Sequence, residues 1–226
     1  WNLVTRNVAA LATPPRPRNV EVQPFSLDQL RAILGAAAAD RFEAAFVLAV
    51  TCGPRRGEIL GLKWSDIELD DAPSLRVRRV VQRISGSIVA GDPKSTKSRR
   101  TIALSTMAVD ALRRQRVRQA EGRLAVGAAW RDEEWVFTVA NGGPVDPRNL
   151  LRAWYGVLER AELPKRPLHH ARHGAASLML SEGLPLKLVL ETLGHSTMSL
   201  TADLYSHLMP GDAARVAAAL DRAFGA

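Results

Sequence analysis

The sequence predicts an α+β domain that is mostly α-helical and carries a small antiparallel sheet of three strands. Helical segments with recognisable caps lie before and after one stretch rich in β-branched residues, between Leu75 and Leu104. The chain has 226 residues, of which 46% are hydrophobic, so it can bury a sizeable core. These observations favour one large domain with a short β insert.

Three helices are expected before the sheet. Ser26 can cap the first helix, and Gln29, three residues later, completes a capping box. The second helix covers about 41–52 and is apolar along most of its length, and a Gly-Pro pair follows it. The third helix begins near Arg55 and carries apolar residues on one side.

The sheet is expected to form from strands at 75–84, 88–90 and 101–104. Glycine-containing turns separate the first two strands and follow the second. The connection that leads into the last strand covers 92–100 and is strongly basic. A flexible basic connection of this kind can reach a phosphate.

Helical periodicity returns after the sheet. Ser105 can cap a helix that runs to about Ala120, and 121–146 are expected to be mostly irregular. Further helices are expected at 147–161, 171–182, 185–193, 198–207 and 212–224. The residues expected in the core or at interfaces are Cys52, Trp64, Trp130, Trp135, Trp154 and Tyr155. The arginines between 113 and 118 are expected to form a solvated face.

The charge balance indicates a nucleic-acid partner. Lys and Arg total 31 against 23 Asp and Glu, which gives a formal charge of +8 and a sequence pI near 10.5. The alternative is a basic protein that binds no nucleic acid. No apolar run approaches the roughly 20 residues that span a membrane, and one cysteine cannot form an internal disulfide. We therefore expect a cytoplasmic protein without a membrane partner.

The residues with catalytic chemistry gather in a few short segments. All five histidines lie between 169 and 207. His169 and Arg172 are three residues apart, so a helix places them on one face. Tyr205 follows His195 by ten residues, and Arg55 precedes Glu58 by one helical turn.

These residue types suit metal-free chemistry on a phosphodiester. Two guanidinium groups can hold both non-bridging oxygens and stabilise the charge that grows on them in the transition state. A tyrosine hydroxyl can act as a covalent nucleophile, but its ordinary pKa of about 10 means that a base or a cationic field must assist. A histidine can give that help, and a lysine can protonate the leaving 5′ oxygen.

Four segments resemble motifs of the tyrosine recombinase, or phage integrase, family. They are GPRRGEILGLKWSDI, PKSTKSRRTIAL, LHHARHGAASLMLSEG and LGHSTMSLTADLYSHL, and they occur in the family's order. The resemblance covers about residues 20–210 and implies the DNA breaking-rejoining fold of the family's catalytic domain. Departures are His170, where members often have an acid, and Cys52 and Pro54 beside Arg55.

The resemblance implies a role for each matching residue. The catalytic set would be Arg55, Lys94, His169, Arg172, His195 and Tyr205. Tyr205 would attack the phosphorus and form a 3′-phosphotyrosyl link, and Glu58 would support Arg55. Lys94 would protonate the 5′ oxygen, with Lys97 as the rival because the register of this turn is open. The residues expected to contact DNA are Arg56, Lys97, Arg99 and Arg100.

The implied function is site-specific recombination of double-stranded DNA without metal, ATP or another cofactor. The family resemblance further implies a homo-tetramer on DNA, with accessory DNA-bending proteins as possible partners, in a bacterial cytoplasm at the nucleoid. Residues 1–19 are expected to be the linker and tail of a missing N-terminal core-binding domain, and 211–226 a helix that packs on a neighbouring protomer. The isolated fragment is expected to be monomeric and to bind DNA weakly.

Three other functions stay open at this point. A type IB topoisomerase uses similar chemistry but relaxes supercoils without exchanging partners. A non-catalytic DNA-binding module would bind duplex DNA and form no covalent adduct. A histidine-metal phosphodiesterase would cleave DNA in a chelator-sensitive way, although no carboxylate or cysteine completes a metal set near the histidines.

Overall fold

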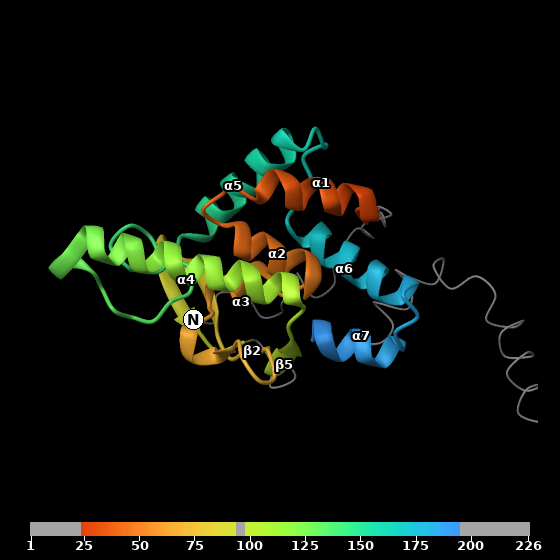
Figure 1. Cartoon of the computed structure of the whole chain (residues 1–226), viewed down its shortest axis with the longest axis horizontal. Helices are drawn as coiled ribbons and strands as arrows, with labels where there is room; N and C mark the ends of the chain where they lie inside the picture. The colour runs from red at the N-terminus through yellow and green to blue at the C-terminus, as the bar shows by residue number, and fades with distance from the viewer. Residues whose placement is uncertain (1–23, 94–97, 195–226) are drawn as a thin grey trace, which may run out of the picture.

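The computed structural model describes residues 24–93 and 98–194, and the structural statements below refer to these residues. Helix α2 (Glu43–Thr51) lies at the centre (Figure 1). Helices α1 (Leu27–Ala37), α4 (Thr106–Val126) and α6 (His169–Ser181) pack against it. The expected mostly helical domain with a small β part is confirmed.

The sequence explains why α2 is the central helix. Its residues from Glu43 to Val50 are all buried, and a helix that is apolar on nearly every side is stable only inside a core. Helix α1 has instead one buried face, formed by Leu30, Ile33 and Ala37. The capping box expected at Ser26 is present, because Ser26 and Gln29 each accept the other's backbone N–H.

The three-stranded antiparallel sheet has a different composition from the expected one. It contains β1 (Ile67–Glu68), β2 (Ser74–Val77) and β5 (Arg100–Ala103), in the order β1-β2-β5. In the register of β2 with β5, Leu75 is opposite Ile102. Both side chains are buried and face the helical core.

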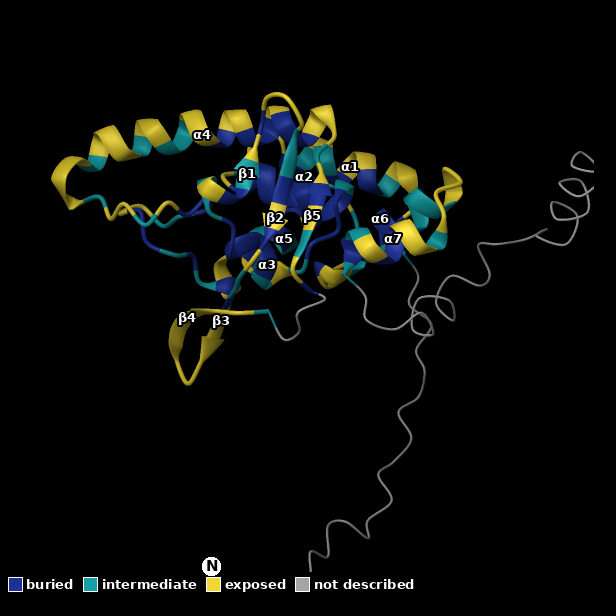
Figure 2. Ribbon diagram, turned by 90° about the horizontal axis from the view of Figure 1, so that it is seen from below, coloured by how far each residue is buried: buried dark blue, intermediate teal, exposed yellow. Residues whose placement is uncertain are grey.

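The stretch expected as one strand over 75–84 is broken into β2 and β3 (Val80–Ile84). Strand β3 pairs with β4 (Ser87–Gly91) in a separate hairpin that projects from the body (Figure 2). The break falls at Arg78 and Arg79, and both side chains pair with the carboxylate of Asp66. We attribute the break to these ion pairs, because they hold Arg78 and Arg79 to Asp66, which lies outside the strands in the short 3-10 helix before β1.

Helix α4 is longer than expected and continues to Val126, so 121–126 are helical and not irregular. Gln115 and Gln119 donate hydrogen bonds to the backbone carbonyls of Val136 and Trp135, which holds the following segment against the helix. The helix ends only at Gly127, whose φ of 60° lies in the left-handed region. Within the additional length, Arg123 forms a 2.9 Å ion pair with Asp132 of the segment that follows the helix.

The remaining described helices are α3 (Arg56–Leu60), α5 (Pro147–Arg160) and α7 (Leu186–Leu193). Helix α6 begins at His169, two residues before the expected start. Cys52, Trp135 and Trp154 are buried as expected, Tyr155 packs half-buried against the core, and Trp64 and Trp130 are half-buried. The helices expected at 198–207 and 212–224 lie outside the described residues.

The arginines of α4 are not simply a solvated face. Arg114 and Arg118 both pair with the buried carboxylate of Glu43 on α2, at 2.5 and 2.8 Å. Arg113 pairs with Asp70. The two pairs with Glu43 attach α4 to the central helix, and the pair with Asp70 attaches it to the connection between β1 and β2.

The expectation of no membrane-spanning segment concerns the helices as well. No helix in the described part of the chain is long and apolar enough to cross a membrane.

Candidate active site

The candidate site begins at the turn between α2 and α3. Gly53 has a φ of +63°, and Pro54 follows it, which directs the chain into the N-cap position at Arg55. The Glu58 carboxylate accepts hydrogen bonds from the Arg55 backbone N–H at 2.9 Å and from Arg55 Nη1 at 2.8 Å. The expected contact of Arg55 with Glu58 is therefore present, and Glu58 itself is 2% exposed.

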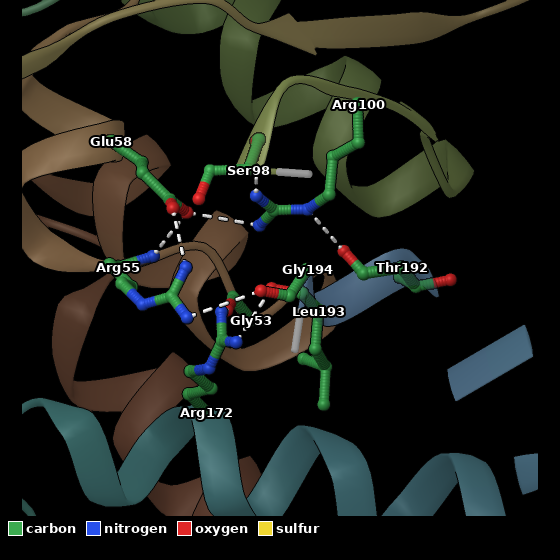
Figure 3. A network of polar contacts seen from close by, with 9 residues as sticks. All are labelled: Gly53, Arg55, Glu58, Ser98, Arg100, Arg172, Thr192, Leu193 and Gly194. Atoms are coloured by element: carbon green, nitrogen blue, oxygen red, sulfur yellow. Dashed lines mark hydrogen bonds and ion pairs between the residues drawn. The ribbon is translucent and has the colours of Figure 1, made fainter. Parts of the chain in front are cut away.

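Arg172 enters the site from α6 and is buried, with 2% of its surface exposed. Its Nη1 donates to the Gly53 carbonyl and its Nη2 to the Leu193 carbonyl, both at 2.6 Å. Arg55 Nη2 donates to the carbonyl of Gly194 at 3.2 Å. The two arginines predicted to hold one phosphate thus bind consecutive carbonyls at the end of α7 (Figure 3).

His169 lies at the start of α6, near both of these guanidinium groups. Burial of the ring, and then the charges of Arg172 and Arg55, lower the pKa of His169 from 6.5 to about 4. Its imidazole is therefore neutral at pH 7. The family resemblance implies that His169 is a general base or a hydrogen-bonding histidine, and a neutral imidazole can accept a hydrogen bond. His173, which was not expected to be catalytic, packs edge-on against it with ring centroids 4.6 Å apart.

Arg100 was expected to contact DNA, but the structure places its side chain in the interior. Its side chain is 7% exposed and donates to the Glu58 carboxylate at 3.0 Å and to the carbonyls of Thr192 and Ser98 at 2.6 and 3.1 Å. The guanidinium is committed to the interior, so we assign it a structural role. Strand periodicity could have indicated this, because Arg100 shares a face of β5 with the buried Ile102.

The other residues expected to bind DNA lie at the surface where they are described. Arg99 forms a 3.0 Å ion pair with Asp92, and both side chains are largely exposed. Arg56 is exposed and lines a cleft of about 570 Å³ between the β3–β4 hairpin and the start of α5. Arg83 and Arg148 also line this cleft, and sequence reasoning did not single them out as a DNA-contacting pair.

Four residues of the predicted site, Lys94, Lys97, His195 and Tyr205, lie outside the described residues. Of the predicted catalytic residues and their partner Glu58, the structure describes Arg55, Glu58, His169 and Arg172. Over 24–93 and 98–194, no group of three or more His, Cys, Asp or Glu side chains is arranged to hold a metal ion.

Comparison with solved structures identifies the fold. The structure superposes on a crystal structure of XerA recombinase with a TM-score of 0.66 and 22% identity, over 93% of this chain and 67% of that one. The Tn1549 transposon integrase in complex with circular intermediate DNA gives a TM-score of 0.70 and 19% identity, over 96% and 71%. The fold is thus that of the catalytic domains of tyrosine recombinases.

The chain belongs to the phage integrase family, because residues 24–211 match the family model described as "Phage integrase family". A tyrosine recombinase XerC-like protein of Caldanaerobacter subterraneus is 34% identical over 217 residues, which cover 91% of this chain and 55% of that protein. An integrase of Saccharopolyspora erythraea is 28% identical over 259 residues, 91% of this chain and 59% of that protein. The chain spans a little more than half the length of these relatives.

Proposed function

We propose that this chain is the catalytic domain of a site-specific DNA recombinase that cleaves and rejoins strands through a 3′-phosphotyrosyl intermediate. One observation carries the proposal: Arg55 and Arg172 lie together beside a neutral His169. Both arginines bond the end of α7, at Gly194 and Leu193, and Gly194 is the residue before His195. Relatives named tyrosine recombinase and integrase support it. The proposal covers both the chemistry and the substrate.

In the proposed reaction, the Tyr205 hydroxyl gives up its proton to His169 or to solvent as its oxygen attacks the phosphorus of one strand. A P–O bond to tyrosine forms as the P–O5′ bond breaks, and Lys94 or Lys97 donates a proton to the leaving 5′ oxygen. The 5′-hydroxyl of the exchanged strand then attacks the phosphotyrosine, and the tyrosine leaves. The number of phosphodiester bonds is conserved, so the reaction needs no ATP.

Arg55 and Arg172 would neutralise the two non-bridging oxygens of this phosphate, which a metal ion does in other enzymes. In the structure their Nη atoms are bonded to carbonyls at Gly53, Leu193 and Gly194. A phosphate is a better acceptor than a neutral carbonyl because the hydrogen bond is then charge-assisted on both sides. DNA binding would therefore exchange carbonyl oxygens for phosphate oxygens at these donors.

The DNA would lie along the basic surface next to the site. Arg56, Arg83 and Arg148 line the cleft beside the hairpin, and Arg99 and Lys97 would add contacts nearby. Such contacts neutralise backbone phosphates without selecting a sequence. We further propose, from the family, that four protomers assemble on two DNA sites in the cytoplasm, with DNA-bending proteins as accessory partners.

The test uses the full-length protein and a pool of duplexes that carry a randomised centre and a nick near the cleavage point. The short fragment between the cleavage point and the nick carries the released 5′-hydroxyl and diffuses away, so any phosphotyrosine is trapped and survives denaturation. We expect adduct with EDTA present and without ATP, and the DNA recovered from it should share one sequence. Two copies of that site on a plasmid should then give recombinant product.

The same experiment separates the other functions. Relaxation of supercoiled plasmid without recombinant product would favour a type IB topoisomerase. Duplex binding without any adduct would favour a non-catalytic DNA-binding module. Cleavage that EDTA abolishes would favour a metal-dependent phosphodiesterase and would overturn the proposal.

A further inference from the structure

Three arginines cap the C-terminal end of α7. Arg100 donates to the carbonyl of Thr192, Arg172 to that of Leu193 and Arg55 to that of Gly194 (Figure 3). The last four carbonyls of a helix have no partner within the helix, and a cation near them is favourable. Here each of three consecutive carbonyls receives its own guanidinium, and the three side chains come from different elements.

Two of these arginines are linked to each other by Glu58. One carboxylate oxygen of Glu58 accepts from Arg55 Nη1 at 2.8 Å, and the other accepts from Arg100 Nη2 at 3.0 Å. Arg100 Nη1 is also bonded to the carbonyl of Ser98, two residues before β5 begins. The Arg100 guanidinium is thus held by Glu58 of α3 and by the segment just before β5, and its Nε donates to Thr192 of α7.

The backbone at the end of α7, at Gly194, packs directly against Arg100. Gly194 adopts the left-handed C-cap conformation, with a φ of +69°. A Cβ atom at Gly194 would lie 2.8 Å from Arg100 Nη1, closer than real Cβ contacts, and 3.1 Å from its Cζ. A side chain at Gly194 would therefore displace the Arg100 guanidinium, so Arg100 and the end of α7 are in close contact.

We propose that Arg100 is a positioning residue for the recombination site, an inference that rests on the proposed function. It holds the end of α7 beside Glu58, and so it fixes the position of Thr192, Leu193 and Gly194 next to Arg55 and Arg172 without touching DNA. All three of its guanidinium nitrogens donate to protein acceptors, and one of these acceptors is the buried Glu58 carboxylate. The acceptors of the Arg172 Nη atoms are neutral carbonyls, which a phosphate can replace. Arg55 and Arg172 contact the same helix end but keep the predicted role on the phosphate.

The test compares Arg100→Met and Arg100→Lys with Arg31→Met in the full-length protein. Arg31 is a matched control because it is an exposed arginine of α1 whose ion-pair partner, Asp28, is also exposed. Three quantities are measured on the nicked duplex: the Kd for DNA with its salt dependence, the single-turnover rate of adduct formation at saturating DNA, and the Tm. Lysine keeps the charge, but one ammonium cannot reproduce three divergent hydrogen bonds.

We expect both Arg100 variants to lower the adduct rate at least about tenfold, the cost of a misplaced catalytic segment. The Kd should stay within about twofold and the salt slope should not change, because no phosphate contact is lost. Arg31→Met should leave all three quantities unchanged. A fall in affinity with a salt slope reduced by about one would mean that Arg100 binds a phosphate, and it would overturn the inference.

A second substrate locates the defect. When sulfur replaces the bridging 5′ oxygen, the leaving thiolate needs no proton from a lysine. If Arg100 acts through α7, the Arg100 variants stay slow on this substrate. Recovery of the rate would instead assign Arg100 to the lysine-bearing turn that precedes β5, and it would contradict the inference.

Gly194→Ala gives an independent variant if the Arg100 variants do not fold. The added methyl group collides with Arg100, so the same loss of rate at unchanged affinity is expected. A Gly194→Ala rate equal to wild type would overturn the inference. If the wild-type protein forms no adduct, the proposed function fails; if it does and these variants match it, only the inference fails.

Discussion

Arg172 Nη2 donates a 2.6 Å hydrogen bond to the carbonyl of Leu193, the last residue of α7. The same guanidinium bonds the Gly53 carbonyl at the turn before α3. One buried cation therefore joins α6 and α7 to the segment that carries Arg55. Hydrogen bonds of this kind have consequences for stability as well as for catalysis.

Arg172→Ala is expected to lower the free energy of unfolding by about 2–3 kcal/mol, because it leaves two buried carbonyls without their charged donor. Arg172→Lys should lose less stability but form no detectable adduct, since a single ammonium cannot span both non-bridging phosphate oxygens. Urea unfolding and the trapped-adduct assay measure the two effects. Wild-type stability in Arg172→Ala would show that these hydrogen bonds do not hold the helices together.

Glu58→Gln is expected to change the pH dependence of stability. Burial raises the pKa of Glu58, but Arg100 and Arg55 outweigh it and hold the pKa below the ordinary value of 4.5. Because the folded pKa lies below the unfolded one, the stabilisation is complete above about pH 5 and is lost as the pH falls through the folded pKa. Removing the charge should cost about 3 kcal/mol at pH 7.

The measurement is urea unfolding of the wild type and of Glu58→Gln between pH 3 and 7. The stability difference between the two proteins should be constant near neutral pH and should shrink in acid. A difference that grows as the pH falls would contradict the ion-pair assignment of Glu58. Other carboxylates are present in both proteins, so their titration cancels in the comparison.

His169 is expected to titrate near pH 4 in the folded protein. Burial is the first cause, and the cationic guanidinium groups of Arg172 and Arg55 add to it, so Arg55→Gln should raise the pKa of His169. NMR titration of the imidazole Cε1–H resonance measures both effects. A midpoint near the ordinary 6.5, unchanged in Arg55→Gln, would place the ring away from these charges.

Arg56→Ala is expected to weaken duplex binding about equally for all sequences and to reduce the salt slope by about one. Arg56 lines the basic cleft beside the β3–β4 hairpin and is exposed. Titrations at several salt concentrations check this, and Arg31→Ala serves as the exposed control on α1. An unchanged slope would move the DNA path away from the cleft.

Local spacing predicted the parts of the site that depend on one helical turn. Arg55 meets Glu58, and His169 and Arg172 begin the same helix, because residues three apart lie on one face. The strand break at Arg79 could not be predicted, because it depends on Asp66, thirteen residues earlier and on another element. The extension of α4 to Val126 could not be predicted either, because its contacts are also with residues outside the helix, such as the ion pair of Arg123 with Asp132.

Alternation with the buried Ile102 along β5 was the one local sign that Arg100 faces the interior, and it was outweighed. Lys97 and Arg99, the basic neighbours of Arg100, favoured a DNA-contacting segment, and composition does not distinguish a buried arginine from an exposed one. Its partners Glu58 and Thr192 are 42 and 92 residues away in the chain. Only packing of α3, β5 and α7 brings them together, so no local pattern indicates the contact.

The most direct test of the account concerns Tyr205. The full-length protein and its Tyr205→Phe variant are incubated with the same nicked duplex, denatured and separated on a gel, and any adduct is digested and sequenced by mass spectrometry. We predict equal DNA affinity for the two proteins, adduct with the wild type alone, and a 3′-phosphonucleotide on the peptide that contains Tyr205. Adduct that persists in Tyr205→Phe, or that maps to another residue such as Tyr155, would contradict the account.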